Sequence, residues 1–133
     1  MSFPKLRSFV LDSRDVRKSA DFYRELLGLE YRPGDETPQE GEDWLVLLAP
    51  DGSWRLAFQQ SDGMKPTTWP DDAIPQQMHL DTAVDSVEEF ERQHERVLKL
   101  GGTVRFDRSD DPEEPLRVYE DPDGHLFCIF VGS

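Results

Sequence analysis

The distribution of apolar and polar residues predicts eight strands and two helices. Short apolar or alternating runs are typical of strands, whereas apolar residues spaced three and four apart are typical of helices. Strands are expected at residues 5–11, 29–32, 44–48, 54–60, 76–82, 103–106, 116–120 and 125–131. Helices are expected at residues 16–27 and 86–100. Each half of the chain therefore has the order strand, helix and three strands, which indicates an α+β fold.

Polar residues and glycines predict where the two helices begin and end. Ser13 or Asp15 is expected to cap the first helix, because a short oxygen-bearing side chain accepts hydrogen bonds from free backbone N–H groups there. Gly28 suits the position just after that helix. Asp85 or Ser86 is expected to cap the second helix in the same way.

Two stretches with the same pattern indicate an internal duplication. APDGSWRLAF and DPDGHLFCIF each read as a type I turn followed by a strand, with proline at the second and glycine at the fourth position of the turn. Gly52 and Gly124 are 72 residues apart, and Ser8 and His79 are 71 residues apart. A nearly constant offset along the chain indicates two related βαβββ modules.

The two modules are expected to form one domain that spans residues 1–133. The first module covers about residues 3–60 and the second about 76–133, while the proline-rich segment of about residues 61–75 links them. Trp69 of this linker is expected to pack on its own domain, and a lid over a ligand site is the alternative.

Composition and charge exclude several classes of function. With 28 acidic and 15 basic residues the net charge is −13, and no cluster of Lys and Arg suits nucleic acid. No apolar run is long enough for a membrane span, and the N-terminus lacks the apolar region of a signal peptide, so a cytoplasmic location is expected. The one cysteine cannot form an internal disulfide. An acidic protein also attracts cationic ligands.

The duplicated pattern resembles the vicinal-oxygen-chelate superfamily, which includes glyoxalase I, extradiol dioxygenases, and fosfomycin and bleomycin resistance proteins. The segments SFVLDSRDVRKSADFYRELLGLEY, MHLDTAVDSVEEFE and DPDGHLFCIF carry the resemblance, which is strongest to the glyoxalase-like branch. The resemblance implies that each module curls a mixed sheet around a crevice. It also implies that two modules per chain pair in a homodimer.

The resemblance also implies where metal ligands would lie, and the sequence departs from that pattern. His79 matches a ligand position, but Ser8 replaces the expected first-module ligand and Cys128 replaces the usual glutamate, with Leu56 as its first-module counterpart. No cofactor and no conventional metal centre are therefore expected. A divalent metal that recruits Asp81 or Asp12 stays open as an alternative, as does a nucleophilic Cys128 activated by His79.

Strand alternation names the residues expected to line the crevices. The candidate ligand-binding residues are Ser8, Val10, Trp54, Leu56, Phe58, Trp69, His79, Asp81, Arg117, Tyr119, Cys128 and Phe130. Arg117 and Tyr119 share one face of their strand, but alternation alone does not say which face. These apolar and aromatic residues with few polar groups suit a flat organic ligand, although filling a core is the competing interpretation.

Two functions follow from this site. The first is a homodimeric protein that sequesters an aromatic or cationic natural product or antibiotic, similar to the bleomycin resistance type, without breaking bonds. The alternative is an enzyme: either a metal-dependent lyase, isomerase or dioxygenase, or a metal-free catalyst that uses His79 and Asp81 as acid and base.

Overall fold

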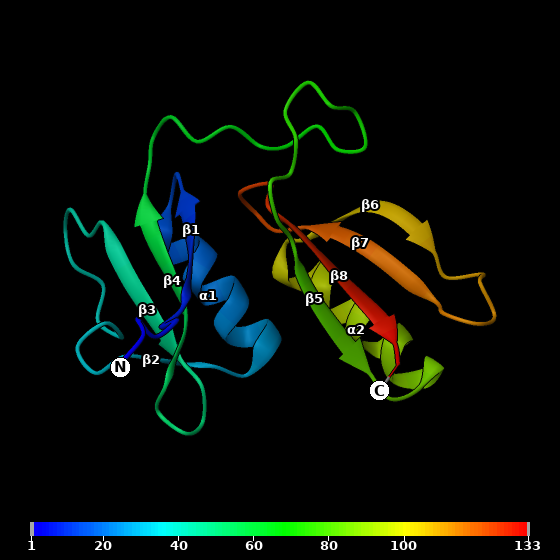
Figure 1. Cartoon of the computed structure of the whole chain (residues 1–133), viewed down its shortest axis with the longest axis horizontal. Coiled ribbons are helices and arrows are strands. Elements are labelled where there is room, and N and C mark those ends of the chain that lie inside the picture. The colour runs from blue at the N-terminus through cyan, green and yellow to red at the C-terminus, as the bar shows by residue number, and fades with distance from the viewer. Residues whose placement is uncertain (1, 133) are drawn as a thin grey trace. The chain divides into compact units, whose positions relative to one another are not determined.

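The computed structural model describes residues 2–132 and divides the chain into two compact units. The first unit ends at Met64 and the second begins at Lys65 (Figure 1). Each unit contains one helix and one open, mixed sheet of four strands. The expected α+β fold of two βαβββ modules is therefore confirmed. Residues 65–75, expected to belong to a linker, are part of the second unit.

The first unit follows the predicted order of elements. Its elements are β1 (Phe9–Ser13), α1 (Val16–Leu27), β2 (Glu30–Tyr31), β3 (Trp44–Leu48) and β4 (Trp54–Gln60). The sheet order is β1-β4-β3-β2, with β1 and β4 parallel and the other pairs antiparallel. Helix α1 packs against β3 and β4.

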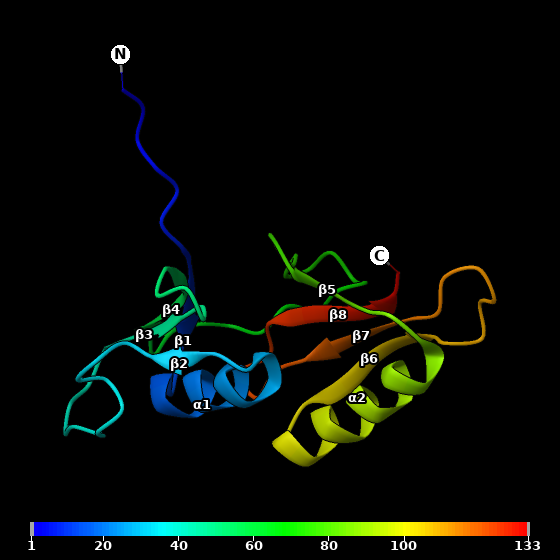
Figure 2. The same cartoon turned by 90° about the horizontal axis from the view of Figure 1, so that it is seen from below.

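The second unit repeats this arrangement. Its elements are β5 (Leu80–Val84), α2 (Val87–Leu100), β6 (Thr103–Arg108), β7 (Leu116–Glu120) and β8 (Leu126–Val131). The sheet order is β5-β8-β7-β6, and β5 and β8 are parallel. Figure 2 shows α2 along one face of this sheet, where it packs against β8 and β5.

Both predicted helices are confirmed, together with their caps. The Asp15 side chain accepts a hydrogen bond from the backbone N–H of Lys18 at 3.2 Å, and α1 ends at Gly28. The Ser86 side chain accepts one from the N–H of Glu89 at 3.1 Å, so Ser86 rather than Asp85 caps α2. Ser13 instead accepts a bond from the N–H of Asp15.

The first strand of each unit begins later than the sequence predicts. β1 begins at Phe9 rather than at residue 5, and its pairing with β4 starts there, opposite Leu56. β5 begins at Leu80 rather than at residue 76, because Gln77 has a φ of 62° and interrupts the extended chain. Ser8 and His79 consequently lie just before the strands that were expected to hold them.

The two units differ by one residue in the stretch between the turn glycine and the paired part of the following strand. Leu56 of β4 lies opposite Phe9, and Phe127 of β8 lies opposite Leu80, so these strands repeat at an offset of 71. The turn glycines repeat at 72 because the β3–β4 register shifts between Leu47 and Leu48 and passes over one residue of β4.

The shift corrects one expectation about Cys128. Because Cys128 follows Phe127, its counterpart in the first unit is Ala57, which follows Leu56. Leu56 was expected to be that counterpart. Counting from the turn glycines gives Leu56, because the extra residue of β4 lies between the turn and the rest of the strand.

Each unit has a stacked pair of aromatic rings in its core, between helix and sheet in the first unit and between neighbouring strands in the second. In the first unit Tyr23 of α1 stacks on Phe58 with ring centroids 5.9 Å apart. In the second unit Tyr119 stacks on Phe127 at 5.3 Å. All four rings are buried, and buried rings of this size contribute strongly to core stability.

The described residues include no helix long and apolar enough to cross a lipid bilayer.

The duplicated turn offers a matched test of packing in the second unit. Gly52 and Gly124 have φ of 86° and 97°, so alanine is strained at either position by about 1–2 kcal/mol. Only at Gly124 would the new Cβ collide, because it would lie 2.5 Å from Cβ of Pro66. We expect Gly124→Ala to lower the free energy of unfolding by about 1–3 kcal/mol more than Gly52→Ala, measured by urea denaturation. Equal losses would contradict the packing of Pro66 on this turn.

Candidate functional site

A cavity of about 330 Å³ lies on the sheet of the second unit. It is lined by Trp69, Gln76, His79, Asp81, Phe106, Arg108, Leu116, Val118 and Cys128. Arg117 and Tyr119 of β7 contact α2 through Glu91 and His94, so the alternate residues Leu116 and Val118 face away from the helix. The cavity therefore lies on the sheet face opposite α2.

Strand pairing builds the floor of the cavity. Asp81 of β5 lies directly opposite Cys128 of β8, and Val118 of β7 lies opposite Cys128 on the other side. Residues directly opposite in neighbouring strands share a face. These side chains therefore form a row across three adjacent strands.

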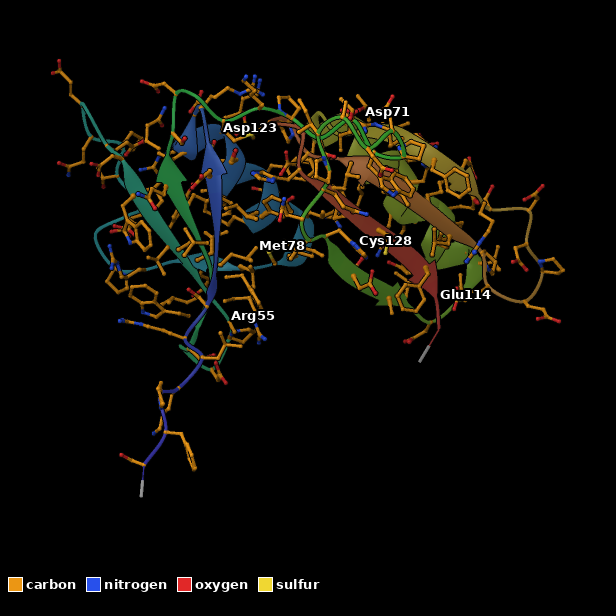
Figure 3. The ribbon with its side chains drawn as sticks, turned by 45° about the horizontal axis from the view of Figure 1, so that its top comes forward. Arg55, Asp71, Met78, Glu114, Asp123 and Cys128 are labelled. Atoms are coloured by element: carbon orange, nitrogen blue, oxygen red, sulfur yellow. The ribbon has the colours of Figure 1, made fainter. Side chains whose placement is uncertain are left out.

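A polar triad lies at the β5 end of this row. His79 Nε2 lies 3.1 Å from Asp81 Oδ1, and Cys128 Sγ donates a hydrogen bond of 2.6 Å to the same oxygen. The side chains of His79 and Asp81 are 45% and 61% exposed, whereas Cys128 is 4% exposed; Figure 3 marks its position on β8. One carboxylate oxygen thus joins a buried thiol to an accessible imidazole.

The thiol of Cys128 is protonated at neutral pH. Burial, the largest cause, and the neighbouring Asp81 carboxylate, which accepts the thiol hydrogen and repels a thiolate, together raise its pKa to about 12. Because the thiolate is the reactive form, Cys128 is a poor nucleophile in this setting. The pKa thus weighs against the hypothesis of a nucleophilic Cys128.

The opposite wall of the cavity is aromatic. Trp69 meets Phe106 of β6 edge to face, with ring centroids 6.1 Å apart and an interplanar angle of 88°. Trp69 therefore packs on its own unit, as expected, and also lines the cavity, while its role as a lid stays a prediction. Phe106 is 46% exposed, which leaves ring surface available to a ligand.

Arg108 is the one arginine among the lining residues, and acidic partners offset its charge. Its Nη2 donates to Glu114 Oε1 at 2.9 Å, and its Nε lies 3.7 Å from Asp111 Oδ2. Asp81 has no arginine or lysine partner among the described ion pairs, and its contacts are with His79 and Cys128. The charge that the cavity offers a ligand is therefore negative.

Four of the sequence-predicted residues come together in this cavity: Trp69, His79, Asp81 and Cys128. Phe130 shares the face of Cys128 by alternation but does not line the cavity.

Arg117 and Tyr119 lie on the helix side of the sheet and not in the cavity. Arg117 pairs with Glu91 and Asp107 at 3.1 Å each, and the Tyr119 hydroxyl is 3.0 Å from His94 Nδ1. These contacts join α2 to β6 and β7. We therefore exclude both residues from the candidate site.

The predicted residues of the first unit do not line the cavity. They are Ser8, Val10, Trp54, Leu56 and Phe58. Phe58 stacks on Tyr23 of α1, and Leu56 shares its side of β4, so both belong to the core. The Trp54 ring is covered by Arg7, whose Cζ lies 3.3 Å from the ring centroid. For Leu56 and Phe58 the core-filling interpretation is the correct one.

Sequence reasoning missed five lining residues: Gln76, Phe106, Arg108, Leu116 and Val118. Strand alternation in LRVYE could have indicated Leu116 and Val118, because they lie on the face of β7 opposite to Arg117 and Tyr119. Phe106 and Arg108 were missed because β6 runs to Arg108 and contains an irregularity that alternation does not reveal.

The polar triad also has the donor atoms of a metal site. The ligand atoms of His79, Asp81 and Cys128 all lie within 4.8 Å of one another. Nitrogen, oxygen and sulfur donors suit Zn²⁺ better than Mg²⁺ or Mn²⁺, and three protein ligands leave a position open. A bound Zn²⁺ would act there as a Lewis acid. Binding would require the Cys128 thiol to lose its proton, which its raised pKa opposes.

The pKa of Cys128 gives a direct test of the triad. Asp81→Asn removes the negative charge and should lower the pKa of Cys128, measured from thiolate ultraviolet absorbance during a pH titration. Asp51→Asn in the first unit is the control and should leave it unchanged. An unchanged pKa in Asp81→Asn would refute the thiol–carboxylate contact.

The same pKa predicts how the stability of the wild type depends on pH. The pKa of Cys128 is raised above its ordinary value of 9.0, so the contribution of this thiol to the free energy of unfolding is complete below pH 9.0 and is lost as the pH rises toward 12.

Comparison with known proteins agrees with this architecture. The glyoxalase-like domain family matches residues 8–130. The fosfomycin resistance protein FosX from Listeria monocytogenes, in its tetragonal form, superposes with a TM-score of 0.71 at 20% identity, over 99% of this chain and 94% of that chain. A glyoxalase/bleomycin resistance protein/dioxygenase family enzyme from Burkholderia phytofirmans PsJN gives 0.67 at 15% identity, over 94% and 96%.

A third structure, FosX from Mesorhizobium loti, gives a TM-score of 0.67 at 20% identity, over 100% of this chain and 95% of that chain. A search of curated proteins found no match. At these identities the structural neighbours show a common fold and do not establish a common ligand. The family match spans nearly the whole sequence, and the chain therefore belongs to the glyoxalase-like domain family of the vicinal-oxygen-chelate superfamily.

Proposed function

We propose that the second unit binds a small organic cation that carries an aromatic ring, and holds it without breaking a bond. The observation that carries this proposal is the cavity itself, which combines the Trp69–Phe106 wall with the accessible Asp81 carboxylate. Its volume of about 330 Å³ falls in the lower part of the range of small-molecule sites.

The aromatic wall supports a flat ligand. Trp69 and Phe106 meet edge to face, so their exposed ring surfaces can contact a third ring. Leu116 and Val118 add aliphatic surface from β7. A ligand ring bound here would leave water and gain contacts on several sides.

The charge distribution supports a cation. Glu114 and Asp111 offset the charge of Arg108, whereas the Asp81 carboxylate remains accessible and has no arginine or lysine partner among the described ion pairs. The net charge of −13 adds a weak attraction for cations at longer range. A quaternary ammonium beside an aromatic wall is also stabilised by the cation–π interaction.

The chemistry of the triad supports binding rather than catalysis. The high pKa of Cys128 keeps the thiol protonated, and Asp81 is engaged by that thiol and by His79. The structural neighbours include fosfomycin resistance proteins and an enzyme of the glyoxalase/bleomycin resistance protein/dioxygenase family, so antibiotics belong in a ligand screen. We propose a sequestering role of the bleomycin resistance type, in a cytoplasmic homodimer.

A metal-dependent enzyme is the second candidate, and the closeness of three donor atoms favours it. In this candidate His79, Asp81 and Cys128 hold a divalent ion, and the same cavity receives the substrate. His79 would otherwise be the accessible acid or base of a metal-free reaction, with Asp81 as its hydrogen-bond partner.

Fluorescence titration tests the binding proposal. Benzyltrimethylammonium should change the emission of the wild type, and Trp69→Phe should remove most of that change, while Trp44→Phe in the first unit should preserve it. Asp81→Asn should weaken binding about tenfold, because it removes the Coulomb attraction between the carboxylate and the ammonium, which is about 1–4 kcal/mol for a partly exposed pair of charges about 4 Å apart. No response to this probe or to a wider panel of aromatic cations would refute the proposal.

Cobalt titration tests the metal candidate separately. If the triad holds a metal, Co²⁺ should produce a thiolate-to-cobalt absorption band with release of the thiol proton, and both should disappear in Cys128→Ser. His79→Ala should weaken Co²⁺ binding by at least about tenfold. A wild type without this band at excess Co²⁺ would exclude the metal candidate and leave the binding proposal intact.

A further inference from the structure

We infer that Arg105 is a positioning residue that sets the preference of the cavity for aromatic ligands. It does not line the cavity, and the sequence pattern did not single it out. It acts by fastening the segment that carries Trp69 to the sheet that carries Phe106. The inference rests on the proposed function, which it deepens by naming what selects the aromatic ring.

Arg105 occupies an irregular position in β6. Val104 lies opposite Tyr119 and Phe106 lies opposite Val118, so the register passes over Arg105. An extra residue of this kind forms a bulge, which redirects side chains and is common beside functional sites. Because of the bulge, two consecutive residues contribute to the same wall of the cavity. Phe106 lines the cavity, and Arg105 donates a hydrogen bond to the backbone carbonyl of Trp69.

The guanidinium of Arg105 bridges the sheet and this segment. Its Nη1 donates to the carbonyl of Trp69 at 2.5 Å and to the carbonyl of Thr67 at 3.3 Å. Its Nε donates to Glu120 Oε1 at 2.9 Å, and its Nη2 contacts the same oxygen. The side chains of Arg105 and Glu120 are only 19% and 27% exposed, so water screens this pair less than it screens a surface pair.

The segment attached by Arg105 has its own internal hydrogen bonds. Thr67 Oγ1 donates to the carbonyl of Ile74 at 2.6 Å, and the N–H of Thr68 donates to the same carbonyl at 2.8 Å. The N–H of Trp69 donates to Thr67 Oγ1 at 3.1 Å. These bonds close a loop over residues 67–74, in which Figure 3 marks Asp71. The loop can therefore keep its shape when Arg105 is removed, while its attachment to the sheet is lost.

Losing this attachment should affect aromatic ligands selectively. The edge-to-face contact of Trp69 and Phe106 depends on the loop staying against β6, whereas Asp81 is held by β5 and does not depend on it. A ligand that uses only its charge should bind a variant of Arg105 almost as well as it binds the wild type. A ligand that also uses its ring should bind that variant more weakly.

Two probes with the same charged group separate these effects. Benzyltrimethylammonium carries an aromatic ring, and (cyclohexylmethyl)trimethylammonium carries its saturated counterpart. Calorimetry should show a preference of the wild type for the aromatic probe of about two- to tenfold, the range expected for an aromatic contact. Arg105→Ala should abolish that preference, whereas Arg92→Ala on α2 should preserve it. A preference that persists in Arg105→Ala would overturn the inference.

A measurement without ligand keeps this test independent of the proposed function. In a background of Trp44→Phe and Trp54→Phe, Trp69 is the one remaining tryptophan. Acrylamide should quench its emission more strongly in Arg105→Ala, and Arg105→Lys should give partial recovery because an amine keeps the charge but lacks the fork of donors. Unchanged quenching in a folded Arg105→Ala would refute the positioning role.

Failure of both probes to bind the wild type would instead refute the proposed ligand class, and quenching alone would then decide whether Arg105 positions Trp69.

Discussion

The pairing of β5 with β8 is the constraint on which the candidate site depends. Parallel pairing places Asp81 directly opposite Cys128, and it does so on the sheet face that α2 leaves uncovered. The carboxylate then accepts the thiol hydrogen and meets His79, which lies two residues before Asp81. A shift of one residue in this register would direct Asp81 toward the helix and separate it from His79 and Cys128.

The two units show how a duplicated fold can place a site in one copy. Both keep the capped helix and the mixed sheet. They differ in where a strand is irregular: β4 pairs with a register shift near its start, and β6 does so at Arg105. In the second unit that irregularity brings the Trp69 segment and Phe106 together, which gives this unit its aromatic wall.

Sequence reasoning predicted the fold well because caps, turns and apolar periodicity are local. Asp15, Ser86 and the two turn glycines act within a few residues of themselves, and the elements beside them were predicted almost to the residue. The site was predicted in part. His79 and Cys128 were found through the family resemblance and Asp81 through strand alternation, but the side of Arg117 and the bulge at Arg105 depend on partners far along the chain.

The central claim is that an aromatic cation enters the cavity of the second unit, and nuclear magnetic resonance tests it most directly. The chain contains three tryptophans, and each indole N–H gives its own signal. Titration with benzyltrimethylammonium should shift the signal of Trp69 progressively and leave those of Trp44 and Trp54 in place. A shift confined to Trp44 or Trp54, or no shift at saturating probe, would contradict the claim.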